Sequence, residues 1–538
     1  MSTTSFVVRF FKAVAGFLAC GTNSSIFIKI FRKTASFFVL LWKVFTSSVV
    51  FRFLCLVADS IAECYGNSRL HRALTGEELE KDSKSSLFYR VYATVVAAVT
   101  GFLAKVLLLF APASSSSVAF SSVFATHASG EKSYRRYTGI FGFIIAIMFC
   151  VPHTMWNNFY GFIISLVLFA LVIYGYAAKK ENALIYPYKT YLSLILFFAS
   201  ITLSLFVSRN LSDSIRIYVF FITSILLCVC VSIFASEKKA FRSICGLLFG
   251  CVVVTGVVGI VQAILKVEAD ASLTDLTLNA DMPGRVFSTM GNPNNFAQVL
   301  VLFMPFALAY ALSSKGKFKK LVLCTFMLIP FAALLQTYSR SGWIAFAVSA
   351  VVFTVLSNRR AVPFMFLLCL LAVPLLPEAV LNRILTIGNL EDSSSSYRLV
   401  IWQGALEMLG DVWATGVGIG PGAFKSIFPV YAYGTTAEVA HCHMQFLEVF
   451  LETGIIGFIS FSWMTLTVIK RSFVSSSSKD KEVKYFAAAA AASMTGIIFI
   501  GFFEYYWFYP RVMFSFFIST GLAIAVYRMS RDENRNAG

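Results

Sequence analysis

The sequence predicts an all-α, polytopic membrane protein with about 12 transmembrane helices and one large extracytoplasmic loop. Of its 538 residues, 58% are hydrophobic and only 13% are charged, and the mean hydropathy is +0.76. This apolar content far exceeds what a soluble core needs, so lipid is the expected solvent. Apolar segments of roughly 20 residues, the length of a span, recur along the chain. Basic residues gather in every second connection between them, which sets an orientation.

The first 130 residues are predicted to form a basic, amphipathic, membrane-associated N-terminal region. Their apolar runs are interrupted by cations such as Lys43 and Lys105, each costing about 2.5 to 3.5 kcal/mol at the centre of a span. Basic amphipathic helices on the inner leaflet are therefore the main interpretation. The alternative is a pair of spans near 34–58 and 87–113 with snorkelling cations, which leaves the later topology unchanged.

The predicted membrane domain, residues 131–530, contains twelve apolar segments, and residues 531–538 are expected to be a cytoplasmic tail. The segments lie near 138–152, 159–178, 190–207, 216–235, 241–265, 294–312, 319–338, 341–356, 361–376, 444–468, 485–503 and 511–529.

Alternate connections in this domain are basic, with cations at Lys179, Lys180, Lys189, Lys238, Lys239, Arg242, Lys315, Lys317, Lys319, Lys320, Arg359, Arg360, Lys470, Arg471, Lys479, Lys481 and Lys484. The positive-inside rule makes these connections cytoplasmic. The loop at 377–443 then lies outside, and it is the one predicted soluble region large enough to shape a site. The net charge of +18 is explained by topology and contact with anionic membrane lipid. The sequence has no basic patch interleaved with aromatic residues, which is the pattern that would indicate a nucleic-acid partner.

Three arginines fall in connections that are predicted to lie outside, where cations are few: Arg285, Arg340 and Arg398. Each is expected near the outer membrane boundary. An arginine there can clamp phosphate oxygens with its planar fork of donors, which suits a lipid-linked pyrophosphate. The alternative for any single one of them is snorkelling to lipid headgroups.

A turn at Gly291-Asn292-Pro293 directly precedes a span and makes Asn294 available as its N-cap. The free amides of a helix start can also bind an anion. The alternative is a capped helix with no further role.

Within the outer loop, Leu399, Trp402, Leu406 and Leu409 recur at helical spacing. They predict an amphipathic helix that packs against the membrane domain and carries Arg398 near its start. The glycine-rich run 416–422 follows it. With no strand before it and with a proline inside it, the run predicts a tight turn and not a nucleotide-binding loop.

Two histidines, His441 and His443, stand immediately before the span at 444–468. An imidazole is suited to take a proton from a sugar hydroxyl at neutral pH. Two alternatives remain: a histidine that only caps or hydrogen-bonds at a helix start, and a zinc site formed by His441, Cys442 and His443, which lacks a second ligand cluster.

These residues resemble the O-antigen ligase and O-antigen polymerase group of polytopic bacterial glycosyltransferases. The late motif of that family is a histidine, a small polar residue, nine variable residues and Gly-x-x-Gly. It matches His443, the stretch 445–453, Gly454 and Gly457. Met444 departs from it, so orientation of the imidazole would fall to a group other than the usual polar neighbour.

Three earlier matches occur in order: Asn-Pro-Asn at 292–294, Thr-x-Ser-Arg-Ser-Gly at 337–342, and Arg398 with Trp402. All matches together span residues 283–457, about a third of the chain. The resemblance does not extend to the first 130 residues, and it implies nothing about their function.

The resemblance implies glycan transfer from an undecaprenyl-pyrophosphate-linked donor to a hydroxyl of a lipid, glycan or protein acceptor. Transfer would occur at the extracytoplasmic face of the plasma membrane, without nucleotide sugar, cofactor or metal. His443 would be the general base, Arg340 and Arg398 would be catalytic cations, and Arg285, Asn294 and Trp402 would bind substrate. Ligase, polymerase and protein O-glycosyltransferase activities all require such a base and such cations, so these residues do not distinguish between the three.

A transporter or flippase of lipid-linked glycan is the alternative function. It also could have twelve helices and arginines that face an anionic lipid. Its signs would be charged groups at mid-membrane and repeated halves with broken helices. The polar clusters of this sequence instead gather at one predicted face.

Overall fold

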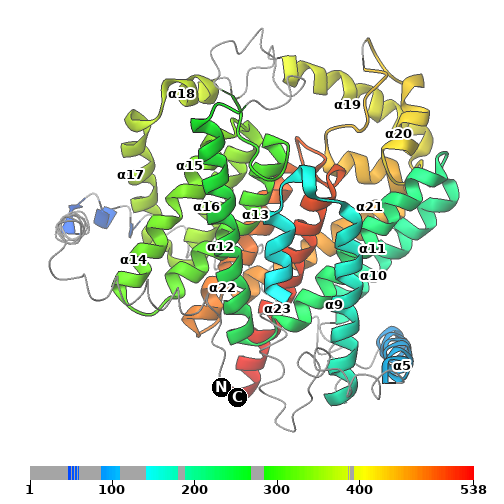
Figure 1. Cartoon of the computed structure of the whole chain (residues 1–538), viewed down its shortest axis with the longest axis horizontal. Coiled ribbons are helices and arrows are strands. Elements are labelled where there is room, and N and C mark those ends of the chain that lie inside the picture. Colours follow the sequence, from blue (N-terminus) through cyan, green and yellow to red (C-terminus); the bar gives the residue numbers. More distant parts are fainter. Residues whose placement is uncertain are drawn as a thin grey trace. The chain divides into compact units, whose positions relative to one another are not determined.

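A computed structural model describes residues 87–108, 141–179, 188–267, 284–385, 393–434 and 436–537, with residue 387 and a few positions between 47 and 59. All regular secondary structure in these residues is helical (Figure 1). Most of the N-terminal region predicted at 1–130 lies outside the described residues. Its described part is mainly α5 (Leu87–Leu108), which packs against α9 (Asn158–Lys179).

The chain divides into two compact units. One combines residues 1–68 with 359–369, and the other combines 69–358 with 370–538. In the first unit, Arg359 Nε lies 3.1 Å from Asp59 Oδ1. The second unit contains every candidate site residue.

Eight helical stretches in the described residues are long and apolar enough to cross a membrane. They are α11 (Leu211–Phe234), α12 (Lys238–Ile264), α13 (Pro293–Ser313), α14 with α15 (Lys317–Phe326 and Leu328–Gln336), α16 with α17 (Arg340–Asn358 and Val362–Ala372), α21 (Gln445–Ser475), α22 (Lys481–Ile500) and most of α23 (Pro510–Ala537). Shorter apolar helices occur at Tyr89–Leu103, Phe141–Cys150, Asn158–Val172 in α9, and Tyr191–Val207 in α10 (Tyr188–Ser204) and the turn after it.

The prediction of an all-helical, multi-pass membrane protein is therefore confirmed for the described residues. Each of the twelve predicted apolar segments coincides with an apolar helix or part of one. The stretches predicted at 341–356 and 361–376 are joined in one apolar run, Arg340–Ala372. Helix α23 continues to Ala537, so most of the expected tail is the end of a helix.

The centre of the second unit is formed by α13, α22 and α23, the most deeply buried of the apolar helices. Helix α22 packs against both α13 and α16, and α23 packs against α11 and α22. Six consecutive alanines, 487–492, are fully buried in α22. Small side chains let helix backbones approach closely, which is how packing stabilises helices that lack a hydrophobic driving force in lipid.

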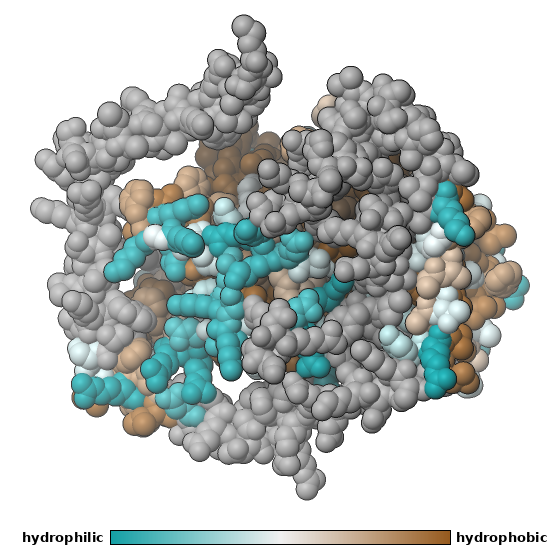
Figure 2. Space-filling view, turned by 90° about the horizontal axis from the view of Figure 1, so that it is seen from below, coloured by the Kyte–Doolittle hydropathy of each residue, from teal (hydrophilic) through white to brown (hydrophobic). Residues whose placement is uncertain are grey.

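Ion pairs join several of the basic connections at one end of this unit. Lys238 Nζ lies 2.5 Å from Asp480, and Arg242 lies 2.5 Å from Glu482 and donates to the carbonyl of Ser313. Helices α12 and α22 start at this end, and α13 finishes there. Figure 2 views this end, where hydrophilic side chains gather. The start of α13 and the end of α22 therefore lie at the opposite end.

Between α17 and α21, the chain forms α18 (Glu378–Leu385), α19 (Ser393–Val412) and α20 (Pro421–Ile427), seen at the top of Figure 1. We call residues 377–444 the α18–α20 segment.

The α18–α20 segment has an apolar cluster of its own. The buried members are Ile401, Ala405, Met408, Val417, Phe424, Phe428, Val439 and Cys442, together with Leu447 and Leu451 of α21.

The predicted apolar stripe of α19 is wrong in two of its four residues. Leu399 and Leu406 are 46% and 59% exposed, whereas Ile401, Ala405 and Met408 are fully buried. Trp402 and Leu409 do pack against the cluster. The buried face is therefore rotated relative to the predicted one. Helix α19 does pack against the membrane domain, as predicted, through α21, and it also packs on other parts of its own segment.

Candidate functional site

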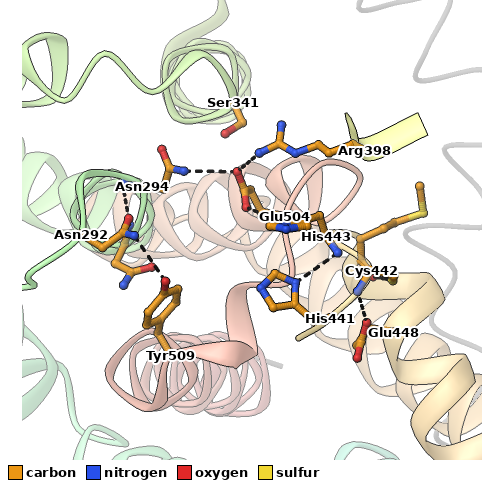
Figure 3. A network of polar contacts seen from close by, with 12 residues as sticks. Asn292, Asn294, Ser341, Arg398, His441, Cys442, His443, Glu448, Glu504 and Tyr509 are labelled. Atoms are coloured by element: carbon orange, nitrogen blue, oxygen red, sulfur yellow. Dashed lines mark hydrogen bonds and ion pairs between the residues drawn. The ribbon is translucent and has the colours of Figure 1, made fainter. Parts of the chain in front are cut away.

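A polar network lies at the end of the bundle opposite the basic connections, with the carboxylate of Glu504 at its centre (Figure 3). Glu504 belongs to the connection between α22 and α23. One of its oxygens, Oε1, accepts from Arg398 of α19 at 2.5 Å and from the amide of Asn294 of α13 at 3.4 Å. The other, Oε2, lies 3.8 Å from Nδ1 of His443. Three segments far apart in sequence therefore meet at one carboxylate.

Glu504 is ionised at neutral pH despite its burial. Burial alone would raise the pKa of this carboxyl, but the guanidinium of Arg398 and the imidazoles of His443 and His441 lower the pKa to about 2. The side chain is only 11% exposed. A fixed negative charge thus stands beside an imidazole and a guanidinium, in surroundings where charge interactions are stronger than in water.

The sequence analysis missed Glu504, although the sequence held a sign of it. It is the one acidic residue between Glu482 and Asp532, a stretch made of two spans and their connection. An isolated carboxylate in such an apolar setting is expensive to keep and usually has a functional or pairing role.

Arg285 interacts electrostatically with three other arginines. Burial is the main cause that lowers its pKa to about 10, and the positive charges of Arg383, Arg340 and Arg398 add to it, while Glu504 acts in the opposite direction. Arg285 is 8% exposed, and it donates to the carbonyl of Thr337 at 3.0 Å. It remains charged at neutral pH.

Arg383, on α18, is a second residue that the sequence analysis missed. It lies within a short helix of the outer loop, and no motif distinguishes it. Arg340, by contrast, was singled out and is the first residue of α16. Its link to the other arginines is electrostatic, through its effect on Arg285. Its neighbour Ser341 faces the network in Figure 3.

The prediction that Asn294 caps α13 is wrong, because the cap lies two residues earlier, at Asn292. Pro293 is the first residue of α13, and the side chain of Asn292 accepts from the amides of Asn294 and Asn295 at 2.8 and 3.3 Å. The side chain of Asn294 is thereby released for the site. Its oxygen accepts from Arg285 at 2.8 Å, and its amide donates to Glu504.

The two asparagines should therefore respond differently to substitution. Asn292→Ala removes the cap and should lower stability by about 1 kcal/mol, measured as a lower melting temperature in detergent. Asn294→Ala keeps the cap, so its melting temperature should fall less than that of Asn292→Ala, whereas loss of the bonds to Arg285 and Glu504 should reduce the activity of the site. Equal melting temperatures for the two variants would contradict this assignment of the cap.

The two histidines lie against each other, with ring centroids 4.1 Å apart. His443 has a φ of 55°, in the left-handed region that a non-glycine residue seldom adopts. Its amide donates to Nδ1 of His441 at 3.1 Å, which stabilises this strained turn. Burial, followed by the charge of His443, lowers the pKa of His441 well below its usual value. His441 is thus a neutral acceptor that fixes the backbone of His443.

His443 is the imidazole that faces both the network and solvent. Its side chain is 28% exposed. Its Nδ1 is buried and has no hydrogen-bond partner among the described residues, although the carboxylate of Glu504 is near. A buried polar atom without a partner needs an explanation, and a catalytic role is one of those that apply.

Trp402 and Glu448 hold the loop that carries the histidines. The indole of Trp402 donates to the carbonyl of Cys442 at 2.9 Å, and Glu448 of α21 accepts from the amide of Cys442 at 2.6 Å. The backbone N–H and C=O of Cys442, the residue before His443, therefore both have hydrogen-bond partners. In this structure Trp402 contacts the histidine loop, and its predicted role in substrate binding stays a prediction.

Helix α21 is kinked at Gly454, which has a φ of 65° and a ψ of −170°. There the glycine-rich turn packs against it. The amides of Val417 and Gly418 donate to the carbonyls of Leu451 and Glu452, at 2.8 and 3.1 Å. Gly420 donates to the Glu452 carboxylate at 2.8 Å. The glycine-rich run is thus a turn that binds the protein's own groups.

Glu452 also fixes the connection that contains Glu504. The hydroxyl of Tyr505 donates to the Glu452 carboxylate at 3.0 Å, and the amide of Gln445 donates to the carbonyl of Gly501 at 2.8 Å. The backbone on both sides of Glu504 is therefore held against the start of α21.

Gly454→Ala should destabilise the protein by about 1 to 3 kcal/mol, because an alanine at this positive φ is strained. Its Cβ would also lie 2.5 Å from the carbonyl oxygen of Ala414. A lower melting temperature in detergent would show the effect. Gly410→Ala in α19 is the matched control: nothing lies within 4 Å of its Cβ, so the melting temperature should stay equal or rise. Equal stability of both variants would contradict the role of the kink.

No group of three or more His, Cys, Asp or Glu side chains in the described residues is arranged to hold a metal ion. In the histidine loop, Nδ1 of His441 is occupied by the amide of His443, and the thiol of Cys442 is buried and donates to the carbonyl of Met444.

Residues 325–462 match the O-Antigen ligase family. The match includes Arg340, Arg398, Trp402, His441 and His443, and it excludes Arg285, Asn294 and Glu504. Over these residues the chain is similar to that family, which indicates a membrane enzyme that transfers glycan in polysaccharide assembly. Comparison with curated proteins finds no match.

Proposed function

We propose that the protein transfers a glycan from an undecaprenyl pyrophosphate carrier to an acceptor hydroxyl, as an O-antigen ligase or polymerase does, at the extracytoplasmic face of the plasma membrane. His443 is the general base. Arg340 and Arg398 are the catalytic cations, and Arg285, Asn294 and Trp402 bind or position the substrates. About twelve spans form the membrane domain, and the α18–α20 segment covers the site.

The observation that carries this proposal is the meeting of His443 with Arg398 and Asn294 at the carboxylate of Glu504. An imidazole with a carboxylate near Nδ1 keeps its other nitrogen, Nε2, for a proton from substrate. Arginines within the same network supply the charge that a pyrophosphate leaving group requires. A base and an anion site side by side are the two requirements of transfer from a lipid diphosphate.

In the proposed step, the acceptor oxygen attacks the anomeric carbon of the donor glycan while its proton passes to Nε2 of His443. The bond between the anomeric carbon and the pyrophosphate oxygen breaks, and undecaprenyl pyrophosphate leaves with that electron pair. Arg340 and Arg398 stabilise the charge that develops on the leaving group. Direct attack inverts the anomeric centre. Because pyrophosphate is already a good leaving group, positioning supplies much of the rate.

The position of the site at one end of the bundle supports the proposed side of the membrane. The opposite end holds Lys238, Arg242 and their partners Asp480 and Glu482, together with the connections that the positive-inside rule makes cytoplasmic. The network at Glu504 then faces outward, where lipid-linked glycan and acceptor meet.

The decisive experiment supplies purified full-length protein in detergent with an undecaprenyl-pyrophosphate-linked glycan and candidate acceptors. We expect a glycosylated acceptor and released undecaprenyl pyrophosphate without any closed compartment. A transporter or flippase would form no product under these conditions, so absence of product with every acceptor would overturn the proposal. Product length separates polymer growth from single transfer.

A further inference from the structure

The hydrogen bonds of Glu504 are unevenly distributed over its two oxygens (Figure 3). Oε1 accepts from Arg398 at 2.5 Å and from Asn294 at 3.4 Å. Oε2 lies 3.8 Å from Nδ1 of His443, beyond hydrogen-bond length, and this buried nitrogen has no partner in the described part of the chain. The carboxylate is therefore held by the arginine and is not bonded to the imidazole.

A second anion in the site can compete with Glu504 for Arg398. Arg340, Arg383 and Arg398 all act on Arg285, and Glu504 acts on it in the opposite direction. A pyrophosphate brings several oxygens and more than one negative charge, which match the guanidinium fork better than one carboxylate oxygen does. Its arrival gives Arg398 a second anion to bind.

We propose that Glu504 is a positioning residue which changes partner when the donor binds: the pyrophosphate takes Arg398, and the released carboxylate closes onto Nδ1 of His443. This inference rests on the proposed function and adds the order of events to it. Donor binding thus strengthens the base by bringing the carboxylate onto its Nδ1. Acceptor hydroxyls are therefore deprotonated most readily when a donor glycan is in place.

The movement required is small. Closing from 3.8 Å to the usual length of a charge-assisted N–H···O bond takes about 1 Å. The backbone need not move, because Tyr505 and Gly501, on either side of Glu504, are held by Glu452 and Gln445. Rotation of the Glu504 side chain alone can supply the change.

The groups that face His443 decide how its proton affinity responds. Glu504 comes from the α22–α23 connection, Arg398 from α19, His441 from the same loop, and Glu448 of α21 binds the adjacent peptide. Of these, Glu504 is the carboxylate within reach of Nδ1. A carboxylate that bonds to an imidazolium raises the pKa of the imidazole by about 1 unit or more, and fixes the proton on Nδ1 when the ring is neutral.

The test follows the imidazole of His443 by 15N NMR in full-length protein labelled at histidine and placed in lipid bilayers. The chain has five histidines, and a His443→Asn spectrum assigns the signal. Inorganic pyrophosphate is the probe, and sulfate at equal ionic strength is its control. We expect pyrophosphate to raise the titration midpoint of His443 by about 1 unit or more and to convert the neutral ring to the form protonated at Nδ1.

In Glu504→Gln, pyrophosphate should still bind, but the midpoint should rise by less than half of the wild-type amount, because only the direct charge effect remains. Glu407→Gln on α19 is the matched control. Its carboxylate is bonded to the exposed Tyr433, and it should respond as the wild type does. The shift of the His443 proton to Nδ1 is measured in the wild type alone. The proposal can therefore be tested even if Glu504→Gln fails to fold.

Equal shifts in wild type and Glu504→Gln, or no change of the protonated nitrogen, would overturn the exchange of partners and leave the proposed transferase intact. Absence of pyrophosphate binding in calorimetry would overturn the exchange and also the anion site on which the proposed function depends. Loss of transfer in Glu504→Gln by itself would fit a structural role as well, which is why the imidazole is the readout.

Discussion

Replacing His443 with Ala lowers the rate of glycan transfer by roughly 10²- to 10⁴-fold, the usual contribution of a general base. The reason is local: no other described imidazole is placed to substitute for it. His441 is buried, and its Nδ1 already accepts from the backbone of residue 443. The measurement is the initial rate with purified protein, lipid-linked donor and acceptor at fixed pH. Unchanged turnover would remove His443 from the mechanism.

The matched control for this variant is His153→Ala. His153 is exposed, and it lies in the short helical turn before α9. Its replacement should leave the transfer rate within a factor of about 2, a change of less than 0.5 kcal/mol. Both variants should insert into the membrane in normal amounts. A loss of protein in the membrane for His443→Ala would attribute the defect to folding instead.

Replacing Arg398 produces the second large effect, and its two substitutions separate charge from geometry. Arg398→Lys keeps a cation beside Glu504 but loses the planar fork, so transfer should fall about 10- to 100-fold, the value of one charged hydrogen bond of about 1.5 to 3 kcal/mol. Arg398→Ala also leaves a buried carboxylate without its nearest cation. It should lower stability by about 3 to 5 kcal/mol, measured by thermal unfolding in detergent.

A second substitution identifies the cause of that instability. In Arg398→Ala with Glu504→Gln, the uncompensated charge is gone, so stability should recover while transfer stays low. Arg209→Ala, an exposed arginine in the connection before α11, should change neither property. If the double variant were as unstable as Arg398→Ala, the ion pair between residues 398 and 504 would not be the source of the effect.

The helices were predictable from sequence because lipid imposes a simple rule on them. Apolar stretches must be helical and about 20 residues long, and the observed apolar helices coincide with the predicted segments. The α18–α20 segment follows no such rule. Leu399 and Leu406 have the right spacing for a buried stripe but are exposed, since Phe424, Phe428 and Cys442 pack on the neighbouring face of α19. The spacing of apolar residues predicts that α19 is a helix, but tertiary packing decides which face of the helix is buried.

Part of the candidate site could be predicted from the sequence for the same reason. Arg285, Arg398 and His443 stood out as polar groups at span boundaries, and all three lie in one network. Glu504 and Arg383 were missed because their importance comes from neighbours that are distant in sequence. Asn294 was predicted to be the cap that Asn292 provides, because a difference of two residues in the start of a helix turns a capping residue into a residue of the site.

The break at Gly454 has a mechanical consequence. Residues 445–453 are bonded to the glycine-rich turn and to Tyr505, and Ile455, just after the break, donates its amide to the carbonyl of Trp413 at the end of α19. Helix α21 also packs against α10, α22 and α23. Because the helix changes direction at Gly454, one continuous element ties the loop that carries the imidazole both to the outer segment and to the membrane bundle.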